Sequence, residues 1–304
     1  MRVVTQQIYF YSILIVELLF FPFLYFYIFL KNKISSNKEL EIKRTRKSII
    51  SNEIYINIHE WGGYADVRTK SIRGVNEFTC GLKGQIERFS NTNDRFKKNI
   101  YLTISDISLF KYKNLTERNV DVLMPVSNNG MDFSGYSEFY STIKDKPNAY
   151  VLLSNTSVNI IQTEFLDDYI SYMNSNPDVG ILGVSYCSKI MQSFLRNNFN
   201  PHLQSFFLLT TIDVLSEIVK KNGNKFPGKG IIYKRLLIKK GEIAISSLAL
   251  KLGYNLAVTL EDGTVFKFGK NNCLDNGYKR WKLQYSDIRL TCKHPNIINE
   301  IVSD

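Results

Sequence analysis

The chain opens with an apolar segment, and no other feature limits its possible folds as strongly. Residues 8–30 read IYFYSILIVELLFFPFLYFYIFL and contain one charge, Glu17, and one proline, Pro22. A helix of this length reaches roughly 34 Å at about 1.5 Å per residue, which is enough to cross a hydrocarbon core. A cleavable signal peptide has a shorter apolar core and a small-residue cleavage site, which we do not find here. We predict one N-terminal transmembrane helix, with residues 1–31 as the anchor; the density of Tyr and Phe leaves an interfacial helix as the alternative.

Basic residues follow the apolar segment, whereas only Arg2 precedes it. By the positive-inside rule, the chain is expected to cross the inner membrane once, with its large C-terminal part on the cytoplasmic side. Residues 32–50 are polar and basic, so we interpret them as a linker. Its cations either stay solvated or lie against anionic lipid headgroups, and the sequence favours neither interpretation. The basic residues that follow the apolar segment are Lys31, Lys33, Lys38, Lys43, Arg44, Arg46 and Lys47.

Strand and helix patterns alternate after residue 50. Strands are expected where β-branched and aromatic residues gather, and helices in the stretches between them. Such alternation is typical of an α/β fold, with βαβ units on a mostly parallel sheet flanked by helices. This domain is expected over residues 51–260, with a C-terminal extension over residues 261–304. Strands are predicted over 53–59, 100–105, 120–126, 150–154 and 179–184, and helices over 75–90, 134–145, 163–174 and about 241–252.

The composition limits the classes of site and partner. The net charge of +11 suits anionic partners such as nucleic acids, an acidic membrane surface or phosphorylated small molecules. Much of the basic excess lies next to the apolar segment, which disfavours a nucleic-acid partner. The spacing of the cysteines argues against a disulfide framework or a zinc site, and the histidines lack metal-ligand spacing. These residues are Cys80, Cys187, Cys273 and Cys292, and His59, His202 and His294.

Polar residues follow two of the predicted strands, at the edge where a parallel sheet places its ligand site. After the strand at 120–126, Gly130 lets the backbone approach a ligand, and Asp132 suits a ribose or sugar hydroxyl. The alternative is a strand-to-helix turn in which Asp or Ser caps the next helix, and the local pattern favours it. Asn155 and Ser157 follow the next buried strand and suit a diphosphate or a sugar hydroxyl.

Two later segments carry groups that can move protons. In the segment PHLQSFF, His202 and Gln204 share one face if the segment is a strand. His202 then neutralises a leaving diphosphate or acts as an acid or base, and a core histidine bonded to the backbone is an equal alternative. Glu242 falls in the first turn of the helix predicted at about 241–252. There it is either a general base or a carboxylate favoured by the helix dipole, and the local pattern favours the dipole.

Taken in order, four segments resemble the rhamnan synthesis protein F family of glycosyltransferases in bacterial polysaccharide synthesis. The segments are NNGMDFSGY, YVLLSNTS, PHLQSFFLL and GEIAISSLALKLGY, and HLQSFF is the most specific piece. The resemblance covers residues 120–258, under half the chain. It implies a GT-A-like, Rossmann-type fold. It also implies transfer of a sugar from a nucleotide-sugar donor to a lipid-linked or growing polysaccharide acceptor of the rhamnan, O-antigen or capsule type.

The same resemblance gives the candidate residues roles. Glu242 is expected to deprotonate the acceptor hydroxyl, and His202 to stabilise the leaving diphosphate. The Asp-x-Asp metal motif of GT-A enzymes is not matched at Asn155 and Ser157, so no metal ligands are predicted and a Mg²⁺ or Mn²⁺ cofactor is doubtful. This departure supports the alternative, a non-catalytic glycan- or nucleotide-binding protein on the same scaffold. The residues expected around the donor are Asn129, Gly130, Asp132, Asn155, Ser157, Gln204 and Ser205.

Overall fold

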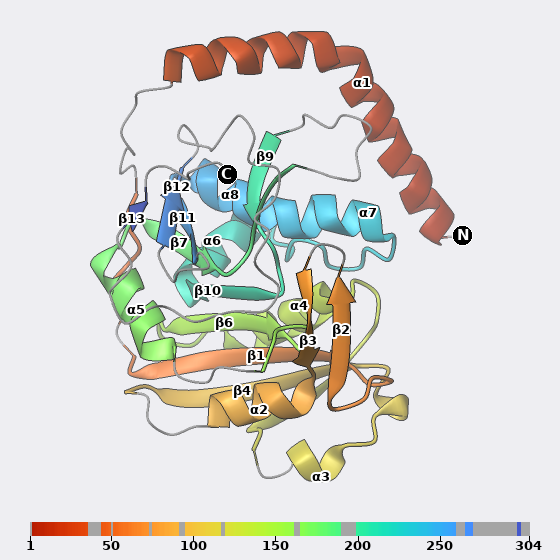
Figure 1. The fold of residues 1–304 in the computed structure, drawn as a ribbon, viewed down its shortest axis with the longest axis vertical. Helices are drawn as coiled ribbons and strands as arrows, with labels where there is room; N and C mark the ends of the chain where they lie inside the picture. Colours follow the sequence, from red (N-terminus) through yellow and green to blue (C-terminus); the bar gives the residue numbers. More distant parts are fainter. Residues whose placement is uncertain are drawn as a thin grey trace.

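The computed structural model shows an α/β domain with a long helix, α1, at its N-terminal end (Figure 1). Residues 36–43 of the expected linker lie outside the described part of the chain, as does most of the expected C-terminal extension. The described residues are 2–35, 44–49, 51–72, 75–90, 95–116, 119–160, 165–189, 199–259, 265–269 and 297–298.

One mixed sheet forms the centre of the domain. In the described residues it has nine strands in the order β13-β12-β11-β7-β10-β6-β1-β4-β5. Five neighbouring pairs are parallel, whereas β10 runs antiparallel to both β6 and β7, and β12 antiparallel to β11. The predicted mostly parallel sheet flanked by helices is therefore confirmed. Its strands are β1 (Glu53–Trp61), β4 (Lys97–Ser105), β5 (Val122–Val126), β6 (Tyr150–Asn155), β7 (Val179–Gly183), β10 (Phe207–Thr211), β11 (Asn255–Thr259), β12 (Val265–Phe268) and β13 (Ile297–Ile298).

Helices cover both faces of the sheet and enclose two apolar cores. One core lies under α4 (Asp132–Ile143), α6 (Ile212–Lys221) and α8 (Ile243–Leu252), and the other under α2 (Leu82–Ser90) and α5 (Leu166–Ser175). Strand β1 supplies both, because Tyr55 enters the first core while Ile54, Ile56 and Ile58 enter the second. Such burial on both faces is characteristic of a central parallel strand. The short helices are η1 (Ile107–Leu109) and α3 (Lys113–Thr116).

The helix predicted over residues 75–90 is correct only in its second half. Residues 75–80 form strand β3 (Val75–Cys80), which pairs with β2 (Arg68–Ile72) as an antiparallel hairpin. Helix α2 begins at Leu82, after Gly81, whose φ of 136° is incompatible with a helix. A second small hairpin joins β8 (Tyr186–Lys189) to β9 (Phe199–Leu203).

The chain beyond residue 260 contributes to the same sheet. Strand β12 pairs with β11 and buries Val265, Phe266 and Phe268 completely. The domain boundary predicted after residue 260 therefore falls between two paired strands.

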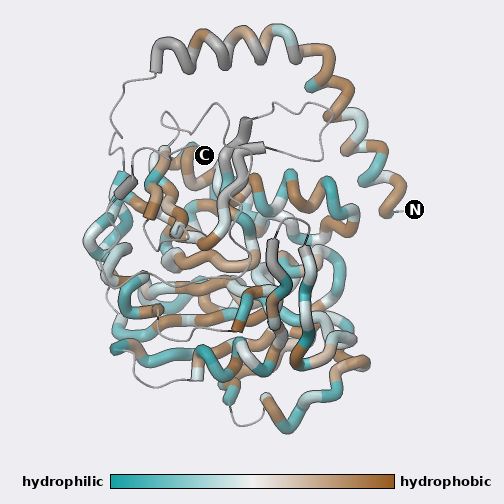
Figure 2. The backbone as a smooth tube through the Cα atoms, in the orientation of Figure 1, coloured by the Kyte–Doolittle hydropathy of each residue, from teal (hydrophilic) through white to brown (hydrophobic). Residues whose placement is uncertain are grey.

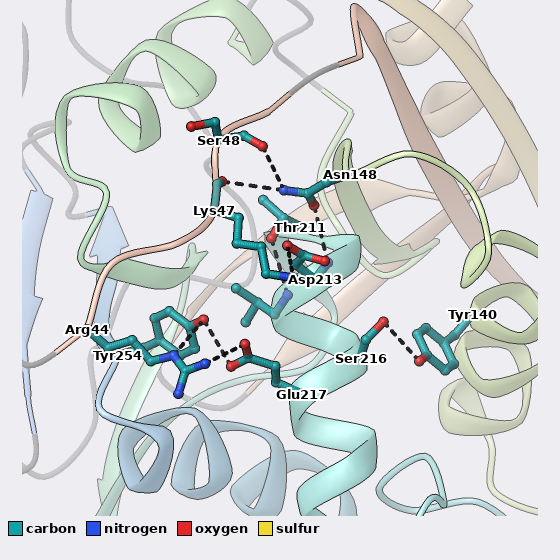
Figure 3. Close-up of polar contacts among 11 residues, drawn as sticks. Arg44, Lys47, Ser48, Tyr140, Asn148, Thr211, Asp213, Ser216, Glu217 and Tyr254 are labelled. Atoms are coloured by element: carbon teal, nitrogen blue, oxygen red, sulfur yellow. Dashed lines mark hydrogen bonds and ion pairs between the residues drawn. The ribbon is translucent and has the colours of Figure 1, made fainter.

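Residues 44–48 are bound to the domain (Figure 3). Arg44 Nη2 lies 2.6 Å from Glu217 Oε1, and Arg44 Nε donates to the Tyr254 hydroxyl at 3.2 Å. Lys47 Nζ lies 3.1 Å from Asp213 Oδ2. Both acidic partners belong to α6, so this helix holds the end of the expected linker against the domain.

The sequence suggested that the basic cluster is either solvated or in contact with lipid headgroups. Arg46 fits neither interpretation, because it is only 8% exposed. Its Nε donates to the carbonyl of Val179 at 2.7 Å, and its Nη2 donates to the carbonyl of Met173. The guanidinium also lies 5.8 Å from the centre of the Tyr150 ring. Arg46 therefore acts as an internal bracket between α5, β6 and β7.

Helix α1 (Arg2–Ser35) forms where the sequence predicts a helix, and it contains Pro22. By length and composition, Arg2–Phe20 is apolar enough to cross a membrane. Hydrophobic colour predominates along the described part of the helix in Figure 2. The helix continues past residue 31, the predicted end of the anchor, into the first residues of the expected linker.

Candidate functional site

A cavity of about 730 Å³ lies at one edge of the sheet. Its walls come from the carboxyl ends of β1, β4 and β6, the start of α4, the segment between β9 and β10, and the helical segment that precedes α8. This is the edge at which ligand sites form in parallel sheets. Of the predicted site residues, the cavity brings together Asp132, Asn155, Ser157, His202, Gln204, Ser205 and Glu242.

Strand β10 reaches this edge because it is antiparallel. Its first residue, Phe207, lies opposite Ser154 near the end of β6. The preceding residues His202, Gln204, Ser205 and Phe206 therefore line the cavity together with Asn155. In this way two sequence motifs that are about fifty residues apart become neighbours.

Asp132 and Asn155 form one wall of the cavity. Asn155 Nδ2 donates to Asp132 Oδ2 at 2.7 Å, and Asn155 Oδ1 accepts a hydrogen bond from the backbone N–H of Ser157 at 2.9 Å. Asp132 occupies the first turn of α4, where the helix dipole favours a carboxylate. The side chains of Asp132 and Asn155 are thus held by each other rather than by a helix cap.

Glu242 lies within a continuous helical run, which corrects the prediction that a helix begins at Gly241. Helix α7 (Lys234–Leu237) leads into a π-helical turn (Ile238–Glu242), and this turn leads into α8. The helix-dipole explanation of Glu242 fails, because the dipole acts only in the first turn. Single π-helical turns inside α-helices are frequent at functional sites.

The carboxylate of Glu242 is fixed from two sides. Its Oε2 accepts hydrogen bonds from the backbone N–H of Ser205 at 3.0 Å and from Ser205 Oγ at 3.1 Å. Its Oε1 lies 3.5 Å from His202 Nε2. Burial alone would raise the pKa of Glu242, but the hydrogen bonds and charge of His202 and the bonds from Ser205 outweigh burial and lower the pKa. Glu242 is therefore ionised at neutral pH.

The sequence led us to expect that His202 and Gln204 would share one face of a strand, but they do not. His202 is in β9, whereas Gln204 follows the end of that strand. Gln204 Oε1 accepts a hydrogen bond from Ser185 Oγ at 2.5 Å. Tyr136 connects α4 to the segment between β9 and β10, because its hydroxyl donates to the carbonyl of Ser205 at 2.9 Å.

Asn129 and Gly130 lie beside the cavity and are not among the residues that line it. The carbonyl of Asn129 accepts hydrogen bonds from Ser134 Oγ at 2.6 Å and from the backbone N–H of Gly230 at 3.2 Å. No side chain caps α4, because its N-cap residue is Met131, with a φ of 49°. Such a backbone conformation costs about 1–3 kcal/mol in a residue other than glycine, and strain of this kind clusters at functional sites.

Sequence reasoning missed several residues that line the cavity. His59, Trp61 and Tyr64 come from the end of β1 and the turn that follows it. The rule that selected Asn155, a polar side chain at the carboxyl end of a buried strand, would also have selected His59. Lys70 of β2 and Lys234 of α7 carried no such signal, because their approach to the cavity depends on a hairpin and a helix placed by tertiary packing.

Three of the lining residues are cations, and they gather on one side of the cavity. The guanidinium carbon of Arg68 lies 4.2 Å from the centre of the Tyr64 ring, and Arg68 Nη1 lies 3.0 Å from Glu60 Oε2. Burial lowers the pKa of Lys70, and the positive charges of Arg68 and Lys234 act in the same direction. Arg68, Lys70 and Lys234 can together meet the negative charge of a phosphorylated ligand.

The residues of the cavity do not fit a metal ion held by the protein. In the part of the chain that the structure describes, no three His, Cys, Asp or Glu side chains are grouped as metal ligands. Where GT-A enzymes carry the Asp-x-Asp motif, this chain has Asn155 and Ser157; the carboxylate of Asp132 accepts a hydrogen bond from Asn155 Nδ2, and Asn155 Oδ1 accepts one from the backbone N–H of Ser157. Mg²⁺ prefers carboxylate and phosphate oxygens, which this pair does not offer together.

Gly135 allows α4 to approach the sheet directly beneath the site. A Cβ atom at this position would lie 2.3 Å from His59 Nδ1 and 2.4 Å from Thr103 Oγ1, which are 3.1 Å apart and hydrogen-bonded. We expect Gly135→Ala to destabilise the domain by about 1–3 kcal/mol, although alanine ordinarily favours a helix. Urea unfolding of the two proteins measures this difference. An increase in stability would show that the helix can shift away from His59.

Acid is expected to destabilise the protein through His59. Burial lowers the pKa of this buried side chain from its ordinary 6.5, with the charge of Asp132 opposing the shift. The unfolded chain therefore takes up a proton before the native one, so stability present above about pH 6.5 is lost as pH falls through the lower, folded pKa. Urea unfolding between pH 7 and 5 should show a steeper loss for the wild type than for His59→Asn. Parallel curves would contradict this assignment.

Comparisons with known proteins find only distant structural similarity. Neither a protein-family model nor a curated protein sequence matches the chain. A cytidylyltransferase structure from Leptospira borgpetersenii is similar at 14% identity and a TM-score of 0.36, over 55% of this chain and 64% of that one. A 4-diphosphocytidyl-2C-methyl-D-erythritol synthase from Anaerococcus prevotii is similar at 10% identity and a TM-score of 0.38, over 62% of this chain and 84% of that one.

A third similar structure is a CMP:2-keto-3-deoxy-manno-octonic acid synthetase in complex with CTP, at 9% identity and a TM-score of 0.36. The similarity covers 55% of this chain and 78% of that chain. These similarities are distant, and they assign neither a family nor an activity.

Proposed function

We propose that the protein is a glycosyltransferase that moves a sugar from a nucleotide-sugar donor to a cell-surface polysaccharide or its lipid-linked precursor. One observation carries the proposal. An ionised carboxylate, Glu242, is fixed beside His202 in the same cavity as Lys70 and Lys234. A base and a set of cations at the carboxyl edge of an α/β sheet are what the displacement of a diphosphate by a hydroxyl requires.

Glu242 acts as the general base in this proposal. As the acceptor oxygen attacks the anomeric carbon of the donor, its proton passes to Glu242. A new glycosidic bond forms, the bond between the anomeric carbon and the diphosphate breaks, and the electron pair leaves with the nucleoside diphosphate. Ser205 holds Oε2 of the base, and the proton passes to Oε1, whose position is set by His202 Nε2 at 3.5 Å.

The cations stabilise the departing diphosphate. Arg68, Lys70 and Lys234 lie in the cavity, and none of the steps requires a metal ion held by the protein. His202 is 2% exposed and lies close to Glu242, so its main contribution is to orient and stabilise that carboxylate. This changes the role that the sequence suggested for His202, because the diphosphate is better matched by the lysines.

Two aromatic side chains, Trp61 and Tyr64, line the cavity and suit the nucleoside of the donor. The rings of Trp61 and Tyr64 meet edge to face, with 4.8 Å between their centres. Trp61 Nε1 donates to Asp106 Oδ2 at 2.6 Å, which fixes the indole. Exposed aromatic faces stack on nucleic-acid bases of any identity. The expected donor site thus combines Trp61 and Tyr64 with Asp132, Asn155 and Ser157.

Nucleotide binding gives a test that does not depend on the acceptor. The full chain in detergent is titrated with nucleoside diphosphates, monophosphates and nucleosides, and Lys70→Ala and Lys234→Ala are compared with Lys229→Ala, which changes a lysine outside the cavity lining. We expect each cavity variant to weaken diphosphate binding about tenfold and nucleoside binding little. Equal binding of diphosphate and nucleoside by all proteins would reject the proposed donor site. Diphosphate binding without sugar transfer would instead favour the non-catalytic alternative.

A further inference from the structure

The N-terminal half of α1 is docked on the catalytic domain by a polar side chain. Gln6 Oε1 accepts hydrogen bonds from the backbone N–H groups of Ile232 at 2.8 Å and Tyr233 at 2.9 Å. Gln6 Nε2 donates to the carbonyl of Gly230 at 3.2 Å. One glutamine side chain therefore binds three backbone groups of the segment that leads into α7.

The contact continues for three turns along the same face of α1. Phe10 and Leu14 are buried against Leu236 of α7, and Glu17 forms an ion pair with Lys239 of the π-helical turn. Gln6, Phe10, Leu14 and Glu17 are spaced as one helical face. The charge of Glu17, which weakens the transmembrane prediction, thus has a partner on the domain.

Both flanks of the remaining apolar segment are attached to one side of the same domain. Glu17 binds the π-helical turn, and Arg44 binds α6 at Glu217. A single crossing between them would place Glu17 and Arg44 on opposite sides of the membrane, which these contacts forbid. The apolar residues between Glu17 and Lys31 span roughly 20 Å as a helix, short of the hydrocarbon core of about 30 Å.

The surface that α1 turns away from the domain is apolar and is flanked by cations. Along the docked half, the exposed side chains include Ile8, Ile15, Val16, Leu19 and Phe20, which are 53–68% exposed. Arg235 and Lys240 are exposed on the domain beside this helix, and Lys240 Nζ lies 5.8 Å from the centre of the Tyr9 ring. An apolar face bordered by lysine and arginine is the pattern of a helix that lies in the bilayer interface.

We infer that α1 lies within one leaflet as an in-plane, monotopic helix and does not cross the bilayer. Its exposed face enters the boundary between headgroups and acyl chains, and Arg235 and Lys240 contact anionic phospholipid headgroups. Both ends of the helix then lie on the same side of the membrane as the cavity. This replaces the single-pass topology expected from the sequence with the interfacial alternative.

The docking also determines how the cavity faces the membrane. Helix α7 and the π-helical turn, which bind α1, supply Lys234, Leu237, Ile238 and Glu242 to the cavity wall. This wall therefore lies between the remainder of the cavity and the membrane-embedded helix.

The topology is tested with an epitope tag fused to Met1 of the full chain. Protease is added to right-side-out spheroplasts and, separately, to inverted membrane vesicles, and cleavage of the tag and of the catalytic domain is followed by immunoblot. The in-plane helix predicts that both are accessible in the same preparation and protected in the other. Accessibility of the tag and the domain in opposite preparations would establish a spanning helix and overturn the inference. Loss of the tag by processing of the N-terminus would overturn it as well.

The headgroup contacts are tested by flotation of the purified full chain with vesicles of phosphatidylcholine alone or mixed with phosphatidylglycerol. The double variant Arg235→Glu and Lys240→Glu should lose about tenfold or more of its preference for the anionic vesicles. A matched double variant, Lys111→Glu and Lys113→Glu, changes exposed lysines around α3, at the opposite end of the molecule from α1 (Figure 1). Equal effects of the two double variants would contradict the assigned lipid surface.

Discussion

Replacing Glu242 with glutamine is expected to lower the rate of sugar transfer by about 10²- to 10⁴-fold, with donor binding nearly unchanged. Glutamine has the shape of the carboxylate and can still accept the hydrogen bonds from Ser205, but it cannot take the acceptor proton. The rate constant for transfer and the donor affinity are measured separately, at saturating and limiting donor. Loss of donor binding together with transfer would indicate a structural role for Glu242.

His202→Gln is the matched control, because His202 is the neighbour that could replace Glu242 as the base. If His202 only orients the carboxylate, this variant should lose less activity than Glu242→Gln. The double variant should then be little worse than Glu242→Gln alone, as is usual for residues that act as a unit. A larger loss for His202→Gln would make the imidazole the base and Glu242 its positioning partner.

Arg46→Met is expected to cost about 2–4 kcal/mol of unfolding free energy, the largest stability effect that we predict. The guanidinium is buried and donates to the carbonyls of Val179 and Met173, which would be left without these donors. Methionine fills much of the same volume, so the loss reports mainly the hydrogen bonds. Urea denaturation of the full chain in detergent, with tryptophan fluorescence as the signal, measures the change.

Arg44→Met separates this effect from the loss of a positive charge. Arg44 comes from the same basic cluster, but its side chain is 43% exposed where it pairs with Glu217. We expect this variant to change stability by less than about 1 kcal/mol, because exposed ion pairs contribute little. Equal effects of the two variants would mean that Arg46 is not the internal bracket that its contacts indicate.

Five strands of the sheet, β1, β4, β5, β6 and β7, were the part of the fold that could be predicted from the sequence. Runs such as IYLTIS and YVLLS are rich in β-branched and apolar residues because they are buried on both faces, and they lie in β4 and β6. The hairpin of β2 and β3 was missed because its residues have mixed polarity and its pairing is short. Strands β10 and β11 were not predicted either, and β12 lies in the segment that was expected to be a C-terminal extension.

The positions of candidate residues could be predicted where a strand end determines them, but not where tertiary packing does. Asn155 is the last residue of β6 and Ser157 follows it, and both line the cavity at the strand end, as the sequence predicted. The start of the helix around Glu242 was predicted too late in the sequence, because Gly241 suggests a helix boundary. In the structure, Gly241 lies within the helix, and its lack of a side chain serves packing instead, because a Cβ atom there would come within 2.9 Å of the Phe133 ring. Lys70 and Lys234 approach each other only in the folded protein.

The most direct measurement of the central claim is release of nucleoside diphosphate from a panel of sugar nucleotides by the full chain in lipid nanodiscs. Lipid-linked and polysaccharide acceptors are supplied, and each reaction is run with Mn²⁺ and with EDTA. We predict release from one donor that depends on an acceptor, persists in EDTA and disappears in Glu242→Gln. If the folded protein releases nothing from any donor under these conditions, or if its release is unaffected by Glu242→Gln, the proposed glycosyltransferase site is contradicted.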